Sequence, residues 1–195
     1  MPTQSRVVGV VLELPVASPG ADAPPAPDFT QLFESQSSYV WGTLRRLGVR
    51  ERDLEDLVHD VFLVVHRHLG DYDPRRPIRP WLFGISFRVA AGYRRLARTQ
   101  REVVSDRIEA TDPRPSIEQL LDAKQNDALV MRALELIDLD RRAILLMHEF
   151  DGHTMPEIAD TLAIPLNTAY SRLRLAREQF TSACRRLLAT RGGKR

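Results

Sequence analysis

The feature that most constrains this chain is an apolar stripe at helical spacing near its C-terminal end, which begins within "IPLNTAYSRLRLAREQF", residues 164–180. At about 100° per residue, six small or apolar side chains share one narrow sector: Ala169, Leu173, Ala176, Phe180, Ala183 and Leu187. Such a stripe predicts a long amphipathic helix with one side in a core. The opposite side and its flanks carry Asn167, Ser171, Arg174, Tyr170, Arg177 and Arg172. On an isolated helix these residues would indicate only a solvated face.

The residues just before this helix give its polar face a second interpretation. Thr154 and Glu157 have the spacing of a capping box that starts a short helix, "MPEIADTLA", and Pro165 cannot continue that helix. Two helices joined by a tight turn form a helix-turn-helix arrangement. The major groove, about 12 Å wide, admits one helix whose Arg, Asn and Ser side chains bond base edges or phosphates. The candidate DNA contacts are Asn167, Thr168, Tyr170, Ser171, Arg172, Arg174 and Arg177.

Helical patterns dominate the rest of the chain as well. We expect helices over about residues 28–47, 53–69 and 80–102, and a second helical block from 127. No segment alternates as a strand would, so the predicted class is all-α. The chain divides into a disordered extension rich in Pro and Ala (1–27), a helical domain (28–102), a flexible linker (103–126), a helix-turn-helix domain (127–190) and a basic tail (191–195).

Charge is distributed unevenly along the chain, although the net charge is only +2. Residues 75–107 hold nine arginines and two acidic residues, and residues 166–195 hold eight basic residues and one acid, whereas residues 51–73 hold seven acids and two arginines. Two basic blocks and a distinct acidic block predict two polyanion contacts and a separate protein-binding surface. In the first basic block, Phe83 and Phe87 lie beside arginines, a combination typical of single-strand binding, although both rings could instead pack between helices.

Other function classes fit the sequence poorly. No run of about 18 apolar residues exists, so no membrane insertion is expected. The single cysteine, Cys184, allows no internal disulfide and is typical of a cytoplasmic protein. His66 and His68 would point about 200° apart on a helix and cannot share one ion. A metal site needs three or four convergent ligands, so we expect no metal, no cofactor and no catalytic residue.

Two long stretches resemble one known family. "DLEDLVHDVFLVVHRHLGDYDPRRPIRPWLFGISFRVAAGYRR" is similar to region 2 of bacterial sigma factors of the extracytoplasmic-function (ECF) group. "LDRRAILLMHEFDGHTMPEIADTLAIPLNTAYSRLRLARE" is similar to their region 4. The resemblance covers about residues 29–102 and 127–189, in the order typical of the family. It implies a dissociable initiation subunit of RNA polymerase that directs promoter recognition and has no catalysis of its own.

The resemblance also assigns expected partners. The first domain would bind the clamp of the largest polymerase subunit through Asp56, Val58, His59 and Asp60. It would capture the melted minus-10 element as single-stranded DNA through Arg75, Arg76, Phe87, Arg88, Arg94, Arg95 and Arg98. The second domain would sit on the flap of the β-like subunit and place the helix from Asn167 at the minus-35 element. The family often has a cognate anti-sigma factor, so such a partner is expected.

Several positions depart from the family pattern. Phe87-Arg88 stands where arginine-asparagine is common, and Tyr170 where lysine or arginine is usual, so the base preferences cannot be carried over. Ala163 replaces a frequent glycine, which predicts that this turn needs no left-handed residue. The alternatives are a helix-turn-helix regulator that acts without polymerase and a metal hydrolase. The first leaves the arginine-rich helix unexplained, and the second lacks convergent ligands.

Overall fold

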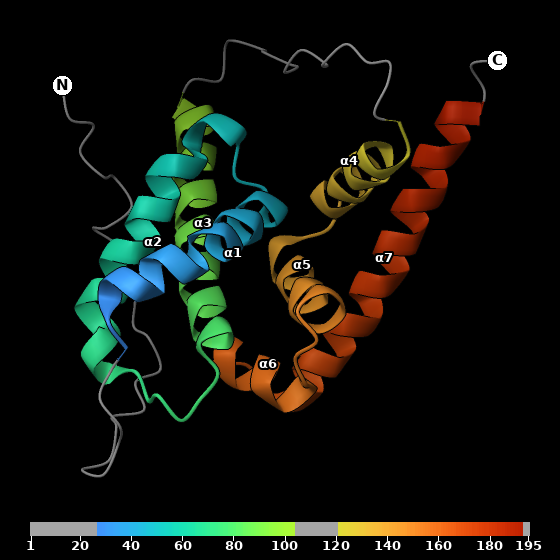
Figure 1. Cartoon of the computed structure of the whole chain (residues 1–195). Helices are drawn as coiled ribbons and strands as arrows, with labels where there is room; N and C mark the ends of the chain where they lie inside the picture. The colour runs from blue at the N-terminus through green and yellow to red at the C-terminus, as the bar shows by residue number, and fades with distance from the viewer. Residues whose placement is uncertain (1–26, 104–120, 193–195) are drawn as a thin grey trace.

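The computed structural model describes residues 27–103 and 121–192, and every regular element in these ranges is helical (Figure 1). No strand occurs within them, which confirms the predicted all-α class. Helices α1 to α3 form a bundle, and helices α4 to α7 form a second group beside it (Figure 1). Most of the predicted extension and linker, and the end of the basic tail, lie outside the described residues.

The first bundle consists of α1 (Phe29–Leu47), α2 (Leu54–His68) and α3 (Ile78–Val103). Helix α1 begins where the sequence predicts, because the Asp28 carboxylate accepts a hydrogen bond of 3.0 Å from the Gln31 amide. It ends at Gly48, whose φ of 93° lies in the left-handed region that favours glycine.

Helix α3 begins two residues before its predicted start. A 3-10 turn, η1 (Glu51–Asp53), precedes α2, and another, η2 (Leu69–Asp71), follows it. Helix α3 then starts at Ile78, so Pro80 is its third residue and not its first. The proline is tolerated there because the first four amides of a helix have no intrahelical partner.

The core of the first bundle draws on all three helices. Leu44, Leu54 and Leu82 are fully buried. Phe83 is 1% exposed and belongs to this core, so of its two sequence interpretations, base stacking is wrong and packing is right. Phe87 is half-buried. The arginine side of α3 therefore keeps only one of the two aromatic rings near the surface.

The second group contains four helices and a π-helical turn. Its elements are α4 (Leu121–Glu135), α5 (Leu139–Leu145), the π turn η3 (Leu146–Phe150), α6 (Met155–Leu162) and α7 (Leu166–Gly192). Helix α4 begins six residues before the expected start of the second block at residue 127. In η3, the Asp151 amide bonds the Leu146 carbonyl at 3.1 Å. The wider π turn inserts a residue and so rotates the side chains that follow it.

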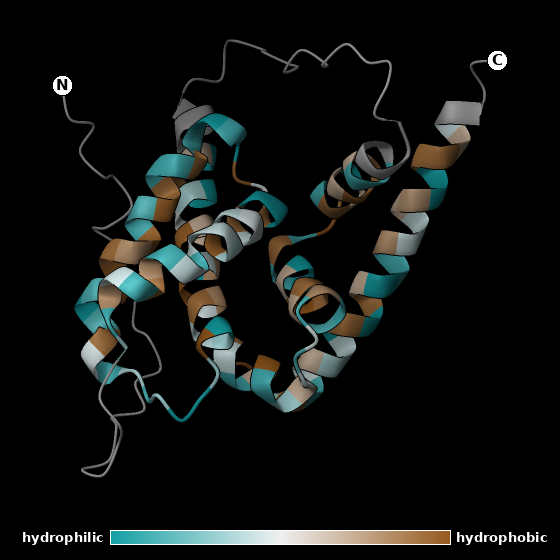
Figure 2. Ribbon diagram, viewed as in Figure 1, coloured by the Kyte–Doolittle hydropathy of each residue, from teal (hydrophilic) through white to brown (hydrophobic). Residues whose placement is uncertain are grey.

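The two groups of helices pack on each other, with α3 against α6 and α1 against α4 and α5. Their buried apolar residues form one continuous cluster, and hydrophobic residues lie mainly on helix sides that face other helices (Figure 2). At the boundary, the Tyr39 hydroxyl donates a hydrogen bond of 2.7 Å to Asp151. The Arg46 guanidinium lies 5.5 Å from the centroid of the Phe150 ring. The two predicted domains are thus in direct contact in this conformation.

Candidate nucleic-acid interface

Helices α6 and α7 form the helix-turn-helix unit that the sequence predicts. The capping box is present, and the Thr154 amide and hydroxyl each donate a hydrogen bond of 2.8 Å to Glu157 Oε2. The Thr154 backbone hydrogen bond is the main cause of a lowered pKa at Glu157. Pro156 lies in the first turn of α6, where its missing N–H leaves no intrahelical bond unmade.

The turn between α6 and α7 corrects the prediction made for Ala163. This residue has φ 52° and ψ 49°, and within the described ranges it is the one residue other than glycine with a positive φ. The turn therefore does need a left-handed residue, which the sequence conceals by placing alanine there. The amides of Ala163 and Ile164 bond the carbonyls of Asp160 and Ala159 at 3.1 and 3.0 Å. These bonds hold the residue in its left-handed conformation.

Helix α7 presents the two faces that its periodicity predicts. The stripe is confirmed: Ala169, Leu173, Ala176 and Ala183 are buried, and Phe180 and Leu187 are half-buried. The candidate DNA contacts lie outside it: Asn167, Tyr170, Ser171, Arg174 and Arg177 are exposed, and Thr168 and Arg172 are half-buried. Tyr170 is 54% exposed, a high value for a large ring, and is therefore available to a partner.

Each candidate arginine of α7 is held by a carboxylate of the same group of helices. Arg174 Nη1 lies 2.7 Å from Glu178, one turn further along α7. Arg172 lies 3.4 Å from Asp140 on α5. Arg177 contacts Glu149 of η3 through Nε at 2.7 Å and Nη2 at 2.6 Å. Nothing in the sequence indicates this role of Glu149, because no spacing rule relates η3 to α7.

The Arg177 contact is also the main cause of a lowered pKa at Glu149. This carboxylate therefore stays ionised at neutral pH and keeps its charge opposite the guanidinium. His148 Nδ1 lies 3.3 Å from the same carboxylate oxygen. The flank of α7 is thus a small charged cluster built by two separate elements.

The candidate single-strand residues of the first bundle lie along α3 and the loop before it. Arg75, Arg76, Arg94, Arg95 and Arg98 are exposed, whereas Phe87 and Arg88 are half-buried. Arg88 Nη1 donates a hydrogen bond of 2.9 Å to the Gly84 carbonyl, and burial lowers its pKa. The exposed guanidiniums form a basic surface able to neutralise phosphates.

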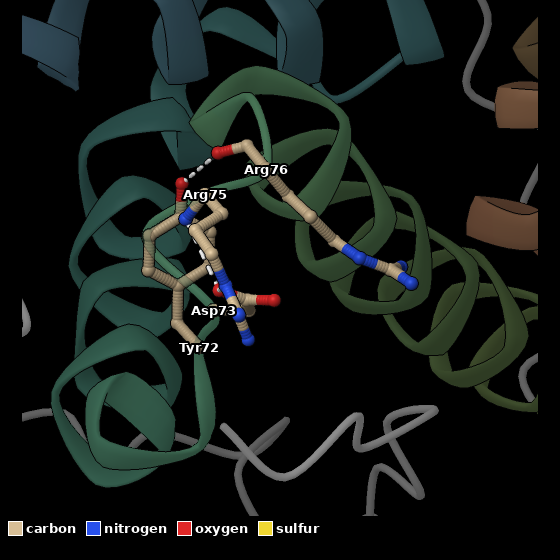
Figure 3. Close-up of polar contacts among 4 residues, drawn as sticks. All are labelled: Tyr72, Asp73, Arg75 and Arg76. Atoms are coloured by element: carbon tan, nitrogen blue, oxygen red, sulfur yellow. Dashed lines mark hydrogen bonds and ion pairs between the residues drawn. The ribbon is translucent and has the colours of Figure 1, made fainter. Parts of the chain in front are cut away.

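The loop between η2 and α3 is held by its own polar groups (Figure 3). The Tyr72 hydroxyl donates a hydrogen bond to the Arg76 carbonyl. The Arg75 side chain and amide donate to Asp73 at 2.9 and 3.1 Å, and the side-chain bond is the main cause of a lowered pKa at Asp73. Tyr72 also packs on Trp81, with ring centroids 5.0 Å apart. These contacts fix the direction in which the loop presents its two arginines.

Part of the basic surface lies beside the second group of helices. Arg76 Nη1 lies 3.0 Å from Asp160 of α6. A cleft of about 700 Å³ lies at this boundary and is lined by both groups of helices, including Arg76, Arg88, Asp160 and Thr161. In this conformation α6 therefore occupies space beside the residues expected to contact single-stranded DNA.

Arg142 of α5 is a buried cation at the same boundary, and no pattern in the sequence indicates its burial. It is 1% exposed, and its Nη2 donates a hydrogen bond of 2.9 Å to the Ile137 carbonyl. Burial, together with the positive charge of Arg94, lowers the pKa of Arg142 to about 10. A Cβ at Gly48 would lie 2.5 Å from Arg142 Nη1, so the C-terminal glycine of α1 also makes room for this side chain.

The expected polymerase-binding residues of α2 divide into two pairs. Asp56 and His59 are exposed, whereas Val58 and Asp60 are buried, at 9% and 4% exposed. This division follows helix periodicity, since one side of an amphipathic helix must be buried. In this conformation only Asp56 and His59 of the four present their side chains to a partner.

Residues 27–103 and 121–192 contain neither a metal-binding cluster nor a membrane-spanning helix. No group of three or more His, Cys, Asp or Glu side chains is placed there to hold a metal ion. None of the helices in these ranges combines the length and the apolar character that crossing a bilayer requires.

A helix-turn-helix unit beside a second helical bundle with an arginine-rich surface defines a two-domain DNA-binding protein. Comparison with known families is more specific. Residues 32–102 match the family described as sigma-70 region 2, and residues 121–180 match the family described as sigma-70 region 4. The two matches fall on the first bundle and on the second group of helices.

Relatives agree with these matches. RNA polymerase sigma factor NccH of Alcaligenes xylosoxydans xylosoxydans is 29% identical over 158 residues, which are 79% of this chain and 85% of NccH. ECF RNA polymerase sigma factor SigL of Mycobacterium tuberculosis is 29% identical over 160 residues, 80% of this chain and 89% of SigL.

Solved structures are similar in fold. The structure of CnrH in complex with the cytosolic domain of CnrY matches with a TM-score of 0.53 at 25% identity, over 79% of this chain and 85% of CnrH. The sigma factor RpoE of Bartonella quintana, in complex with the anti-sigma factor NepR, has a TM-score of 0.62 at 20% identity. The match covers 81% of this chain and 97% of RpoE. This chain belongs to the sigma-70 family of RNA polymerase sigma factors, in its ECF group.

Proposed function

We propose that this chain is a sigma factor that binds RNA polymerase core and directs it to promoters, reading the minus-35 element as duplex and the minus-10 element as single strand. The observation that carries the proposal is the pair of basic surfaces on two separate helical units, one on a reading helix and one on α3. A conventional regulator needs only the first of these surfaces.

Helix α7 would read the minus-35 element in the major groove. Asn167, Thr168, Tyr170, Ser171, Arg172, Arg174 and Arg177 would supply the contacts. Asn and Arg can each form two hydrogen bonds with one base edge, whereas Ser and Thr suit single bonds or phosphates. The exposed Tyr170 ring suits apolar contact with a thymine methyl group.

The loop before α3 and α3 itself would hold the melted minus-10 strand. Arg75, Arg76, Arg88, Arg94, Arg95 and Arg98 would neutralise phosphates, and Phe87 would offer the stacking surface. Binding unpaired bases more tightly than paired ones favours strand separation without an energy source. Exposed Asp56 and His59 of α2 would contact the clamp of the largest subunit, while buried Val58 and Asp60 would support that face from within.

The proposal implies that the two groups of helices separate on a promoter. Helices α3 and α6 are in contact, yet the minus-35 and minus-10 elements are roughly 85 Å apart at about 3.4 Å per base pair. One compact body cannot reach both. The similar structures of CnrH and RpoE are complexes with the cytosolic domain of CnrY and with the anti-sigma factor NepR, which supports an anti-sigma factor as a partner of this chain. A cytoplasmic location follows, because polymerase and chromosome are there.

Reconstitution with polymerase core tests the proposal. The purified chain should bind core, and the complex should start RNA at defined positions on genomic templates. Permanganate should detect unpaired thymines near minus-10, and footprinting should show protection near minus-35. A chain that binds duplex sites alone, as a dimer on palindromes, and never joins core would support the regulator alternative instead.

A further inference from the structure

The ion pair between η3 and α7 has a consequence for how DNA would be read. We infer that Glu149 is a positioning residue, which holds the Arg177 guanidinium in one orientation so that this arginine discriminates between minus-35 sequences. The inference rests on the proposed function of α7 and adds a residue that would touch no DNA itself.

The geometry of the contact fixes which part of the guanidinium remains available. Glu149 Oε1 accepts from Arg177 Nε at 2.7 Å and lies 2.6 Å from Nη2. A guanidinium is planar and has five N–H donors in a rigid fork. With the Nε edge occupied, the donors on Nη1 and the second N–H of Nη2 point away from Glu149. A guanine edge or a phosphate can accept hydrogen bonds from these donors.

The source of the carboxylate distinguishes this arginine from its neighbour. Arg174 is paired with Glu178 of the same helix, so that pair moves with α7 and fixes nothing relative to the rest of the domain. Glu149 comes from η3, whose π turn is secured by the backbone bond from Asp151 to Leu146. The position of the Arg177 guanidinium is therefore fixed relative to both α7 and η3.

Fold stability alone explains this pair poorly. The side chains of Arg177 and Glu149 are 53% and 39% exposed, and ion pairs exposed to this degree contribute little to stability. A carboxylate beside a DNA-reading helix also repels phosphates and lowers general affinity for DNA. Such a charge is useful there if it orders a side chain that must be placed accurately, since misplaced donors lose base discrimination.

Sequence selection by the reconstituted holoenzyme tests the inference. Promoter duplexes with randomised minus-35 positions are bound, separated and sequenced, using polymerase core with the full chain or with Glu149→Gln, Glu149→Ala, Arg177→Ala or the double alanine variant. Asp127→Asn, on exposed α4 surface, controls for the loss of one negative charge. Thermal denaturation of each chain separates misfolding from misreading.

Glu149→Ala should lower the preference for the best minus-35 sequence over the average sequence by roughly 5- to 10-fold. Arg177→Ala should lower this preference equally, and the double alanine variant should lower it no further. Glu149→Gln should fall between, because its amide oxygen can still accept. Affinity for average sequences should stay equal or rise. Full preference in Glu149→Ala, or in Arg177→Ala, would overturn the inference, as would a loss that Asp127→Asn reproduces. If wild-type holoenzyme shows no minus-35 preference at all, it is the proposed function that fails.

Discussion

Replacing Ala163 by glycine should stabilise the protein. Ala163 lies at φ 52° and ψ 49°, a conformation that costs an L-residue roughly 1–2 kcal/mol. Glycine removes this cost but gains freedom in the unfolded chain, which offsets roughly 0.4–1 kcal/mol of the gain. The alanine methyl is exposed and contributes little packing. The free energy of unfolding should therefore rise by about 0.5–1 kcal/mol.

The same substitution four residues earlier is the matched control. Ala159 lies within α6 and is 8% exposed, so Ala159→Gly removes a packed methyl and costs about 1 kcal/mol or more. Urea denaturation followed by circular dichroism at 25 °C should move the two midpoints in opposite directions with equal slopes. A lower midpoint for Ala163→Gly would refute the left-handed assignment and restore the first expectation for this turn.

Three further predictions concern the domain boundary and the reading helix. In Gly84→Ala, a Cβ would lie 3.0 Å from Arg88 Nη1 and 3.2 Å from the Thr161 methyl of α6. The packing of α6 on α3 should weaken, the open population should grow, and small-angle scattering should report a larger radius of gyration. Gly70→Ala, whose Cβ meets nothing within 4 Å, should scatter as wild type, and identical profiles for all three proteins would contradict the α3–α6 contact. Burial and the Asp151 carboxylate raise the pKa of Tyr39, so its neutral form contributes stability that is present below about pH 10 and lost above it. Between pH 9 and 11, the urea midpoint should fall further for wild type than for Tyr39→Phe. Equal falls in the two proteins would show that neutral Tyr39 does not contribute to stability. Arg174→Ala should weaken promoter binding by roughly 1–3 kcal/mol if it contacts a base edge, and an unchanged minus-35 footprint would count against the contact.

Local signals in the sequence were sufficient for most helix ends and for the buried side of α7. Asp28 and Gly48 mark the two ends of α1, and they can be identified from sequence because capping depends on single side chains and a single φ value. Thr154 and Glu157 mark the start of α6. The stripe from Ala169 onward was readable since one side of that helix is apolar and the other is not.

The sequence was less informative where two structures satisfy one pattern. Helix α3 is apolar over a broad arc, so periodicity could not tell that Phe83 packs inside while Phe87 stays near the surface. The left-handed Ala163 was concealed because alanine signals helix and not a turn. The π turn at Leu146–Phe150 follows no residue signature. The position of Glu149 within this turn could therefore not be predicted either. These features depend on contacts between elements, which a one-dimensional pattern does not contain.

The charged contacts at the boundary between the two groups of helices suit separation. The Arg76–Asp160 pair is exposed and contributes little to stability, while Arg142 is a cation whose Nε and Nη1 are buried and make no hydrogen bond within the described part of the chain. Opening would return Arg142 to water and release Arg76, an expected DNA contact, from Asp160. On the proposed function, promoter phosphates and α6 compete for the same side of the first bundle. Tighter binding of DNA to the open form would then shift the population toward it, so promoter engagement and domain separation would be one linked equilibrium.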